Sequence, residues 1–123
     1  MYLVDTNVLI LGIKGLDPDK NFLSKAVRKG QVLISVVSVA EFLTRASEEA
    51  KVKFEKLIDA FPPCGVDLEV ARAAASYRGE LLKVKRVQLL DCFLAAQAKV
   101  HNLTLVTNNK ADFPMKDIKV VSP

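Results

Sequence analysis

The chain contains no tryptophan, a single histidine and only two cysteines, Cys64 and Cys92, among its 123 residues. These cysteines have no metal-type spacing and suggest no disulfide framework, so we expect free, mostly buried thiols in a reducing cytoplasm. Paired histidines and paired thiolates are both missing, which disfavours a zinc site. Long hydrophobic runs are missing too. The apolar N-terminal segment stops at Asp5 and has no basic leader, so we expect neither a signal peptide nor a membrane-spanning helix.

Composition and charge indicate a folded protein and leave its partner open. Half of the residues are hydrophobic, which excludes a disordered chain. The length of 123 residues predicts one domain over 1–123 with a real hydrophobic core. Eighteen Lys and Arg residues against fourteen Asp and Glu residues give a net charge of +4. This mild excess is compatible with a nucleic-acid partner but does not require one.

Strand and helix signals alternate along the chain without a linker or a repeat. Apolar runs of the strand type lie at 2–4, 32–34, 64–66, 103–107 and 118–121. Helical spacing of apolar residues lies between them, from residue 8 and then at 19–29, 35–46, 48–61, 67–82 and 90–100. Residues 83–88 read as a basic connection. The alternation predicts an α/β fold with a mostly parallel central sheet and helices on both faces.

A carboxylate, Asp5, follows the first predicted strand directly. The apolar run Tyr2–Val4 ends there, and helical spacing begins soon afterwards. In open α/β sheets, the carboxyl ends of the strands form the edge where ligands and chemistry are found. Aspartate is also a good helix N-cap, so Asp5 alone does not distinguish a functional site from a cap.

Three further acids could reach the same edge of the sheet. Glu41 comes shortly after the second strand, but Ser38 and Glu41 also match a Ser-x-x-Glu capping box. Asp91 opens the most apolar helix, where a first-turn acid favours the helix dipole but also has unusually apolar neighbours. Asp112 lies in the loop after the strand that ends at Thr107, where ordinary turn chemistry would also account for it.

Taken together, the four acids predict a metal-dependent reaction. A parallel sheet sends Asp5, Glu41, Asp91 and Asp112 toward one edge, where their charges repel unless a divalent cation neutralises them. Hard oxygen ligands without histidine or thiolate pairs favour Mg²⁺ or Mn²⁺. Such a cluster suits phosphodiester hydrolysis, in which the metal activates a water and stabilises charge on the phosphate. Basic side chains would hold the polymer.

The same acids stand in four segments with characteristic neighbours. The segments are Leu-Val-Asp-Thr-Asn-Val-Leu at 3–9, Ser-Val-Ala-Glu-Phe at 38–42, Leu-Asp-Cys-Phe-Leu-Ala-Ala at 90–96 and Leu-Val-Thr-Asn-Asn-Lys-Ala-Asp-Phe at 105–113. In this order and spacing they resemble the successive motifs of PIN-domain proteins. The subgroup that they resemble most is the VapC-type toxin ribonucleases of prokaryotic toxin–antitoxin pairs.

This resemblance implies a fold, an activity and a set of partners. The expected fold is a PIN-like three-layer sandwich over residues 1–123. The expected activity is a Mg²⁺- or Mn²⁺-dependent endoribonuclease that cuts RNA, forms a homodimer and is inhibited by a cognate antitoxin protein. By the same resemblance, Asp5, Glu41 and Asp91 are metal-binding acids, while Thr6 and Thr107 are hydroxyl groups that line the site.

The chain departs from the family pattern at the fourth motif. Many relatives have their fourth acid two residues after the threonine of that motif, where this chain has Asn109. Asp112 follows three residues later, and one helical turn from Asn109 to Asp112, with Phe113 anchored inward, would bring it to the site. We therefore expect Asp112 to complete the acidic site, with Asn109 in a supporting position.

Two other classes of function fit less well. A receiver domain would need paired acids after the first strand, and an Asp-x-Asp phosphatase would need a second aspartate where this chain has Asn7. The alternative that stays open is a catalytically silent PIN module that binds RNA or a partner protein. The costly cluster of Asp5, Glu41 and Asp91 argues against it, because binding alone does not require such a cluster.

Overall fold

The computed structural model describes residues 1–82 and 87–123, and within these ranges one sheet has four parallel strands. Its order is β2-β1-β3-β4, with β1 Tyr2–Val4 and β3 Thr104–Val106 in the centre. The edge strands are β2 Val32–Leu33 and β4 Lys119–Val121. Each pairing is parallel, which confirms the predicted α/β class. The predicted basic connection at 83–88 falls mostly on residues 83–86, which lie outside the described residues.

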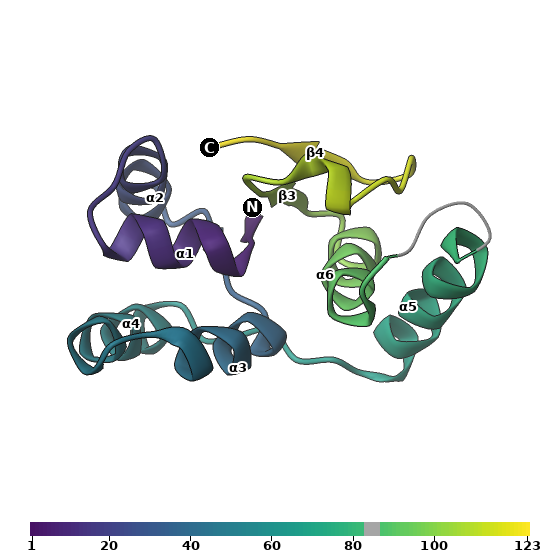
Figure 1. Cartoon of the computed structure of the whole chain (residues 1–123), viewed down its shortest axis with the longest axis horizontal. Coiled ribbons are helices and arrows are strands. Elements are labelled where there is room, and N and C mark those ends of the chain that lie inside the picture. Colours follow the sequence, from purple (N-terminus) through teal and green to yellow (C-terminus); the bar gives the residue numbers. More distant parts are fainter. Residues whose placement is uncertain (83–86) are drawn as a thin grey trace.

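Helices cover both faces of this sheet (Figure 1). They are α1 Thr6–Ile13, α2 Asp19–Arg28, α3 Val36–Arg45, α4 Glu48–Ala60, α5 Leu68–Leu81 and α6 Leu89–Val100, with a short 3₁₀ turn η1 at Lys110–Asp112. In Figure 1, α1, α2 and α4 lie to the left of the view, and α5 and α6 lie to the right. Within the described ranges, no helix combines the length and apolar character needed to cross a bilayer.

The three layers follow from the alternation of side chains along the strands. Leu3 and Leu105 are buried in one hydrophobic cluster together with residues of α5 and α6. Their strand neighbours Val4 and Val106 are buried in a second cluster with residues of α1 to α4. Successive residues of a strand point to opposite faces, so each strand contributes to both clusters. The three-layer sandwich expected from the sequence is therefore confirmed.

The structure decides against the alternative that Ser38 and Glu41 form a capping box. Helix α3 begins at Val36, and its N-cap is Ser35, whose Oγ accepts a hydrogen bond from the Val37 backbone nitrogen at 3.0 Å. Ser38 lies inside the helix, fully buried, and in the described part of the chain its hydroxyl has no hydrogen-bond partner. The strand β2 ends at Leu33, one residue before the end of its apolar run, and α3 begins at Val36, close to the predicted start at residue 35. Glu41 is thereby released from a capping role.

The predicted strand at 64–66 is reduced to one bridge. Cys64 pairs in parallel with Ser35, and no longer ladder extends this contact within the described residues. The Gln97 side chain instead donates its Nε2 hydrogens to the carbonyl oxygens of Cys64 and Gly65, at 3.1 and 3.0 Å. The Cys64 carbonyl also accepts the Val36 backbone N–H at 2.9 Å, so the α6 side chain adds to the bridge and does not replace it.

Candidate functional site

The carboxyl ends of the two central strands bring Asp5 and Thr107 together. Val4 of β1 pairs with Val106 of β3, so the next residue of each strand reaches the same edge. Thr107 is fully buried, and its Oγ1 donates to Asp5 Oδ2 at 2.7 Å. The other oxygen, Oδ1, accepts the Thr6 backbone N–H at 2.8 Å as the N-cap of α1. Asp5 is therefore both the cap and a fixed carboxylate at the strand ends.

Glu41 reaches this edge from α3. The Thr6 side chain, 2% exposed, donates through Oγ1 to Glu41 Oε1 at 2.8 Å. Thr6 belongs to the first turn of α1, directly after Asp5. Thr6 therefore holds two acids: its hydroxyl donates to Glu41, and its backbone nitrogen donates to Asp5.

The 3₁₀ turn η1 brings Asp112 back toward the same strand end. Asn109 donates through Nδ2 to Asp112 Oδ2 at 2.8 Å, while its backbone nitrogen donates to Thr107 Oγ1 at 3.1 Å. The expected turn between Asn109 and Asp112 is present, and Phe113 is anchored inward with 4% exposure. Asn109 itself makes no side-chain cap, because its amide is turned to Asp112.

Asp91 completes the set from the first turn of α6. The pKa of its carboxyl is raised to about 7, mainly by burial and then by the charges of Asp5, Asp112 and Glu41, in that order. The pKa of Asp5 is also raised, first by burial, although its hydrogen bonds to Thr107 and to the Thr6 backbone work in the opposite direction. The four acids are therefore close enough to repel one another. This repulsion favours either protonation of a carboxylate or binding of a cation at this edge of the sheet.

The side chains at this edge of the sheet are of the kind that bind a divalent cation. The donors are carboxylate oxygens, and the hydroxyls of Thr6 and Thr107 stand next to them, which suits Mg²⁺ or Mn²⁺ better than a thiophilic metal. In residues 1–82 and 87–123, no three acid, histidine or cysteine side chains are positioned as a ready-made cage for one ion. Three of the carboxylates, those of Asp5, Glu41 and Asp112, are instead each held by a neighbouring side chain, so coordination of one ion requires side-chain movement.

Sequence reasoning missed a buried acid behind the site. Asp19, in the first turn of α2, is 2% exposed, and its Oδ2 accepts a hydrogen bond from Asn108 Nδ2 at 2.6 Å. Asn108 is the residue between Thr107 and Asn109. An acid at the start of a helix is ordinary in sequence, and only the tertiary contact reveals that it binds the loop after β3.

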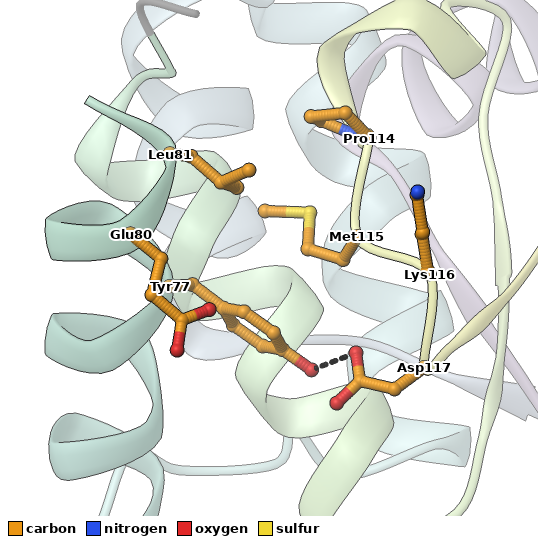
Figure 2. Close-up of a pocket in the computed structure, with 7 residues that line it drawn as sticks. All are labelled: Tyr77, Glu80, Leu81, Pro114, Met115, Lys116 and Asp117. Atoms are coloured by element: carbon orange, nitrogen blue, oxygen red, sulfur yellow. Dashed lines mark hydrogen bonds between the residues drawn. The ribbon is translucent and has the colours of Figure 1, made fainter. Parts of the chain in front are cut away.

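A cavity of about 290 Å³ lies away from the acids, between α5 and the segment that leads into β4 (Figure 2). Tyr77, Glu80 and Leu81 line it from α5, opposite the segment 114–117. Figure 2 shows the Met115 side chain reaching toward Leu81, and the Tyr77 hydroxyl donates to Asp117 Oδ1 at 2.7 Å. This hydrogen bond lowers the pKa of Asp117, whereas burial raises the pKa of Tyr77. None of the four clustered acids lines this cavity.

Similarity to known proteins identifies the family of this chain. Residues 2–119 match the PIN domain, and the chain belongs to that family. It is similar to Ribonuclease VapC10 of Mycobacterium tuberculosis, with 32% identity over 116 residues, which cover 94% of this chain and 87% of that protein. The family predicted from the four motifs is therefore confirmed.

Solved structures share the fold over nearly the whole chain. VapBC2 from Rickettsia felis, bound to a DNA fragment from its promoter, matches with a TM-score of 0.83 and 22% identity, covering 99% of this chain and 98% of that chain. A toxin–antitoxin complex from Klebsiella pneumoniae matches with a TM-score of 0.79 and 25% identity, covering 98% and 96%. The three-layer arrangement is thus shared with these proteins.

Proposed function

We propose that this protein is a metal-dependent endoribonuclease and the toxin of a VapBC-type toxin–antitoxin pair. The observation that supports the proposal is the set of hydrogen bonds that hold Asp5, Glu41 and Asp112 near the carboxyl ends of β1 and β3. The charges of these three acids also raise the pKa of Asp91. The similarity to Ribonuclease VapC10 supports RNA as the substrate. The match over residues 2–119 supports a single PIN domain spanning 1–123.

The four acids are the groups that we propose to hold Mg²⁺ or Mn²⁺. A bound ion of this kind activates water and stabilises negative charge on the attacked phosphate. Thr107 and Thr6 keep Asp5 and Glu41 in place through their hydroxyl groups, and Asn109 does the same for Asp112. Such neighbours orient ligating carboxylates and raise metal affinity without touching the ion.

The partners follow from the same proposal. Solved relatives are toxin–antitoxin complexes, which supports a cognate antitoxin protein as the inhibitor. We also propose a homodimer, supported by exposed apolar side chains, which include Val36, Leu68, Leu82, Leu89 and Leu90. A cytoplasmic location is part of the proposal and is supported by Cys64 and Cys92, which are both free thiols.

The deciding experiment measures cleavage of RNA by purified protein with Mn²⁺, with Mg²⁺ and with EDTA. The expected result is cleavage with either ion and none in EDTA, and Asp5→Asn serves as the inactive control. Cleavage that persists unchanged in EDTA would overturn metal dependence. RNA binding without cleavage in any of these conditions would favour the alternative, a catalytically silent PIN module.

A further inference from the structure

The buried carboxylate of Asp19 has one partner that connects it to the acidic site. Its side chain is 2% exposed, and no ion pair in the described ranges includes it. A buried carboxylate without a cation is unfavourable unless donors satisfy it. The Asn108 amide supplies such a donor at 2.6 Å, across 89 positions of sequence. The N-terminal end of α2 adds favourable partial charge.

The partner of Asp19 lies at the centre of the loop that holds two of the four acids. Asn108 follows Thr107, whose hydroxyl donates to Asp5, and precedes Asn109, whose amide donates to Asp112. The Asn109 backbone nitrogen also donates to Thr107 Oγ1. Fixing Asn108 therefore fixes the residues on either side of it, and these contact Asp5 and Asp112 directly.

The anchor itself is held against α1, the helix that Asp5 caps. At Gly12 of α1, an added Cβ would come within 2.9 Å of Leu23 Cδ2 and 3.3 Å of the Asp19 carbonyl oxygen. The two helices thus touch almost backbone to backbone beside Asp19. The position of Asp19 is therefore fixed relative to α1, and its hydrogen bond with Asn108 fixes the loop after β3 in turn.

We propose that Asp19 is a positioning residue, which sets the loop from Thr107 to Asp112 through Asn108 and so sets the spacing of Asp5 and Asp112. The inference rests on the proposed function, because the spacing of Asp5 and Asp112 affects activity only if these acids bind a metal. Asp19 does not touch the proposed metal or the substrate. Its effect passes entirely through the 2.6 Å hydrogen bond.

The test compares two replacements of Asp19 of similar size, of which only one can accept a hydrogen bond. Asp19→Asn keeps an acceptor for Asn108, whereas Asp19→Leu has a similar size and none. The matched control is Asp17→Leu. Asp17 also accepts a hydrogen bond at the start of α2, from the Asn21 backbone at 3.0 Å, but it is exposed and does not bind the loop.

The first readout is amide hydrogen exchange of Asn109 by NMR, relative to an amide within β3. We expect exchange to be at least about 10-fold faster in Asp19→Leu and near normal in Asp19→Asn and Asp17→Leu. The second readout is RNA cleavage as a function of Mn²⁺, where Asp19→Leu should lose roughly 10–100-fold in metal affinity or activity. If Asp19→Leu does not fold, Asn108→Ala breaks the same contact from the exposed side and is expected to have the same effects.

The outcomes separate this inference from the proposed function. Unchanged Asn109 exchange in both Asp19→Leu and Asn108→Ala overturns the positioning role, whatever happens to cleavage. Equal losses of cleavage in Asp17→Leu and Asp19→Leu overturn it too, because they indicate general destabilisation of α2. If the unmodified protein cleaves no RNA, the proposed function fails, and the exchange measurement still decides whether Asp19 holds the loop.

Discussion

Thr6 and Glu41 are separated by 35 positions of sequence, and their side chains are joined by a hydrogen bond of 2.8 Å. The Thr6 hydroxyl, nearly fully buried, donates to one oxygen of the Glu41 carboxylate. Because Thr6 directly follows Asp5, this bond ties α3 to the strand end that carries the first acid. The position of Glu41 at the site thus depends on a residue outside the acid cluster.

Replacing Thr6 by Val should weaken the site without disturbing the core. Valine has the shape of threonine but lacks the hydroxyl, so Glu41 loses its donor while the Thr6 backbone bond to Asp5 is kept. We expect a roughly 10–100-fold loss of activity or metal affinity, measured as RNA cleavage over a series of Mn²⁺ concentrations. Thr6→Ser restores the hydroxyl and should retain most activity. Full activity in Thr6→Val would show that the hydrogen bond is dispensable.

Neutralising Asp5 or Asp91 should separate activity from stability. Asp5→Asn and Asp91→Asn are expected to abolish cleavage, because each removes a proposed metal ligand. In the absence of metal, the melting temperature of each variant should equal or exceed that of the unmodified protein, since repulsion among the acids falls. Asparagine is also a good N-cap, so Asp5→Asn keeps the cap of α1. A large drop of melting temperature in both variants would indicate that these acids are structural.

The metal-free protein should lose stability between pH 4 and pH 8 through Asp91. Its pKa is about 7 in the folded state, against 3.8 as the ordinary value, so the folded state holds a proton that the unfolded state releases. The stabilisation is complete below pH 3.8 and disappears as the pH rises through 7. Melting temperatures of unmodified protein and Asp91→Asn, measured in EDTA across this range, give the test. The melting temperature of Asp91→Asn should rise relative to that of the unmodified protein as the pH increases toward 8. A difference in melting temperature that stays constant with pH would contradict the prediction.

Asp112 and Asn109 should differ in their effect on metal binding. Asp112→Asn removes a charge from the site, whereas Asn109→Ala removes only the amide that orients Asp112. We expect both variants to need more Mn²⁺ for half-maximal cleavage, with the larger increase in Asp112→Asn. If Asp112→Asn behaves as the unmodified protein does, Asp112 belongs to the turn alone.

The purified protein should be a dimer at micromolar concentration. The adjacent side chains Leu89 and Leu90 are 43% and 45% exposed at the start of α6, and apolar surface of this kind commonly pairs two copies across a two-fold axis. Light scattering on the unmodified protein tests this directly, and a monomeric mass would refute it. Leu89→Lys should weaken the dimer more than Val52→Lys, whose side chain is exposed alone on α4.

The alternation of apolar runs was enough to predict the sheet, its parallel topology and the two helical layers. The errors arose where a local pattern competed with a tertiary contact. Ser38 and Glu41 match a capping box, but α3 already begins at Val36, and its N-cap is Ser35. Residues 64–66 look like a strand, but among the described residues only Cys64 forms a bridge, and Gln97 of α6 donates to the carbonyls of Cys64 and Gly65.

The candidate site was predictable as a set of acids and only partly as a structure. Asp5, Glu41, Asp91 and Asp112 stand in recognisable motifs, and the pairing of β1 with β3 brings Asp5 and Thr107 to one edge. Asp19 carries no comparable signal, because its contact with Asn108 depends on how α2 packs against α1. The roles of the four acids in metal binding stay predictions for the experiments above.

The opposite directions of Leu3 and Val4 also limit how this protein can be changed at its beginning. Inserting or deleting one residue between Tyr2 and Asp5 would exchange the two faces of β1 and turn the Asp5 carboxylate away from Thr107. The exposed Met1 side chain lies outside that constraint. Extra residues ahead of Met1, such as a purification tag, should therefore be tolerated, whereas the spacing within the strand is set by the site itself.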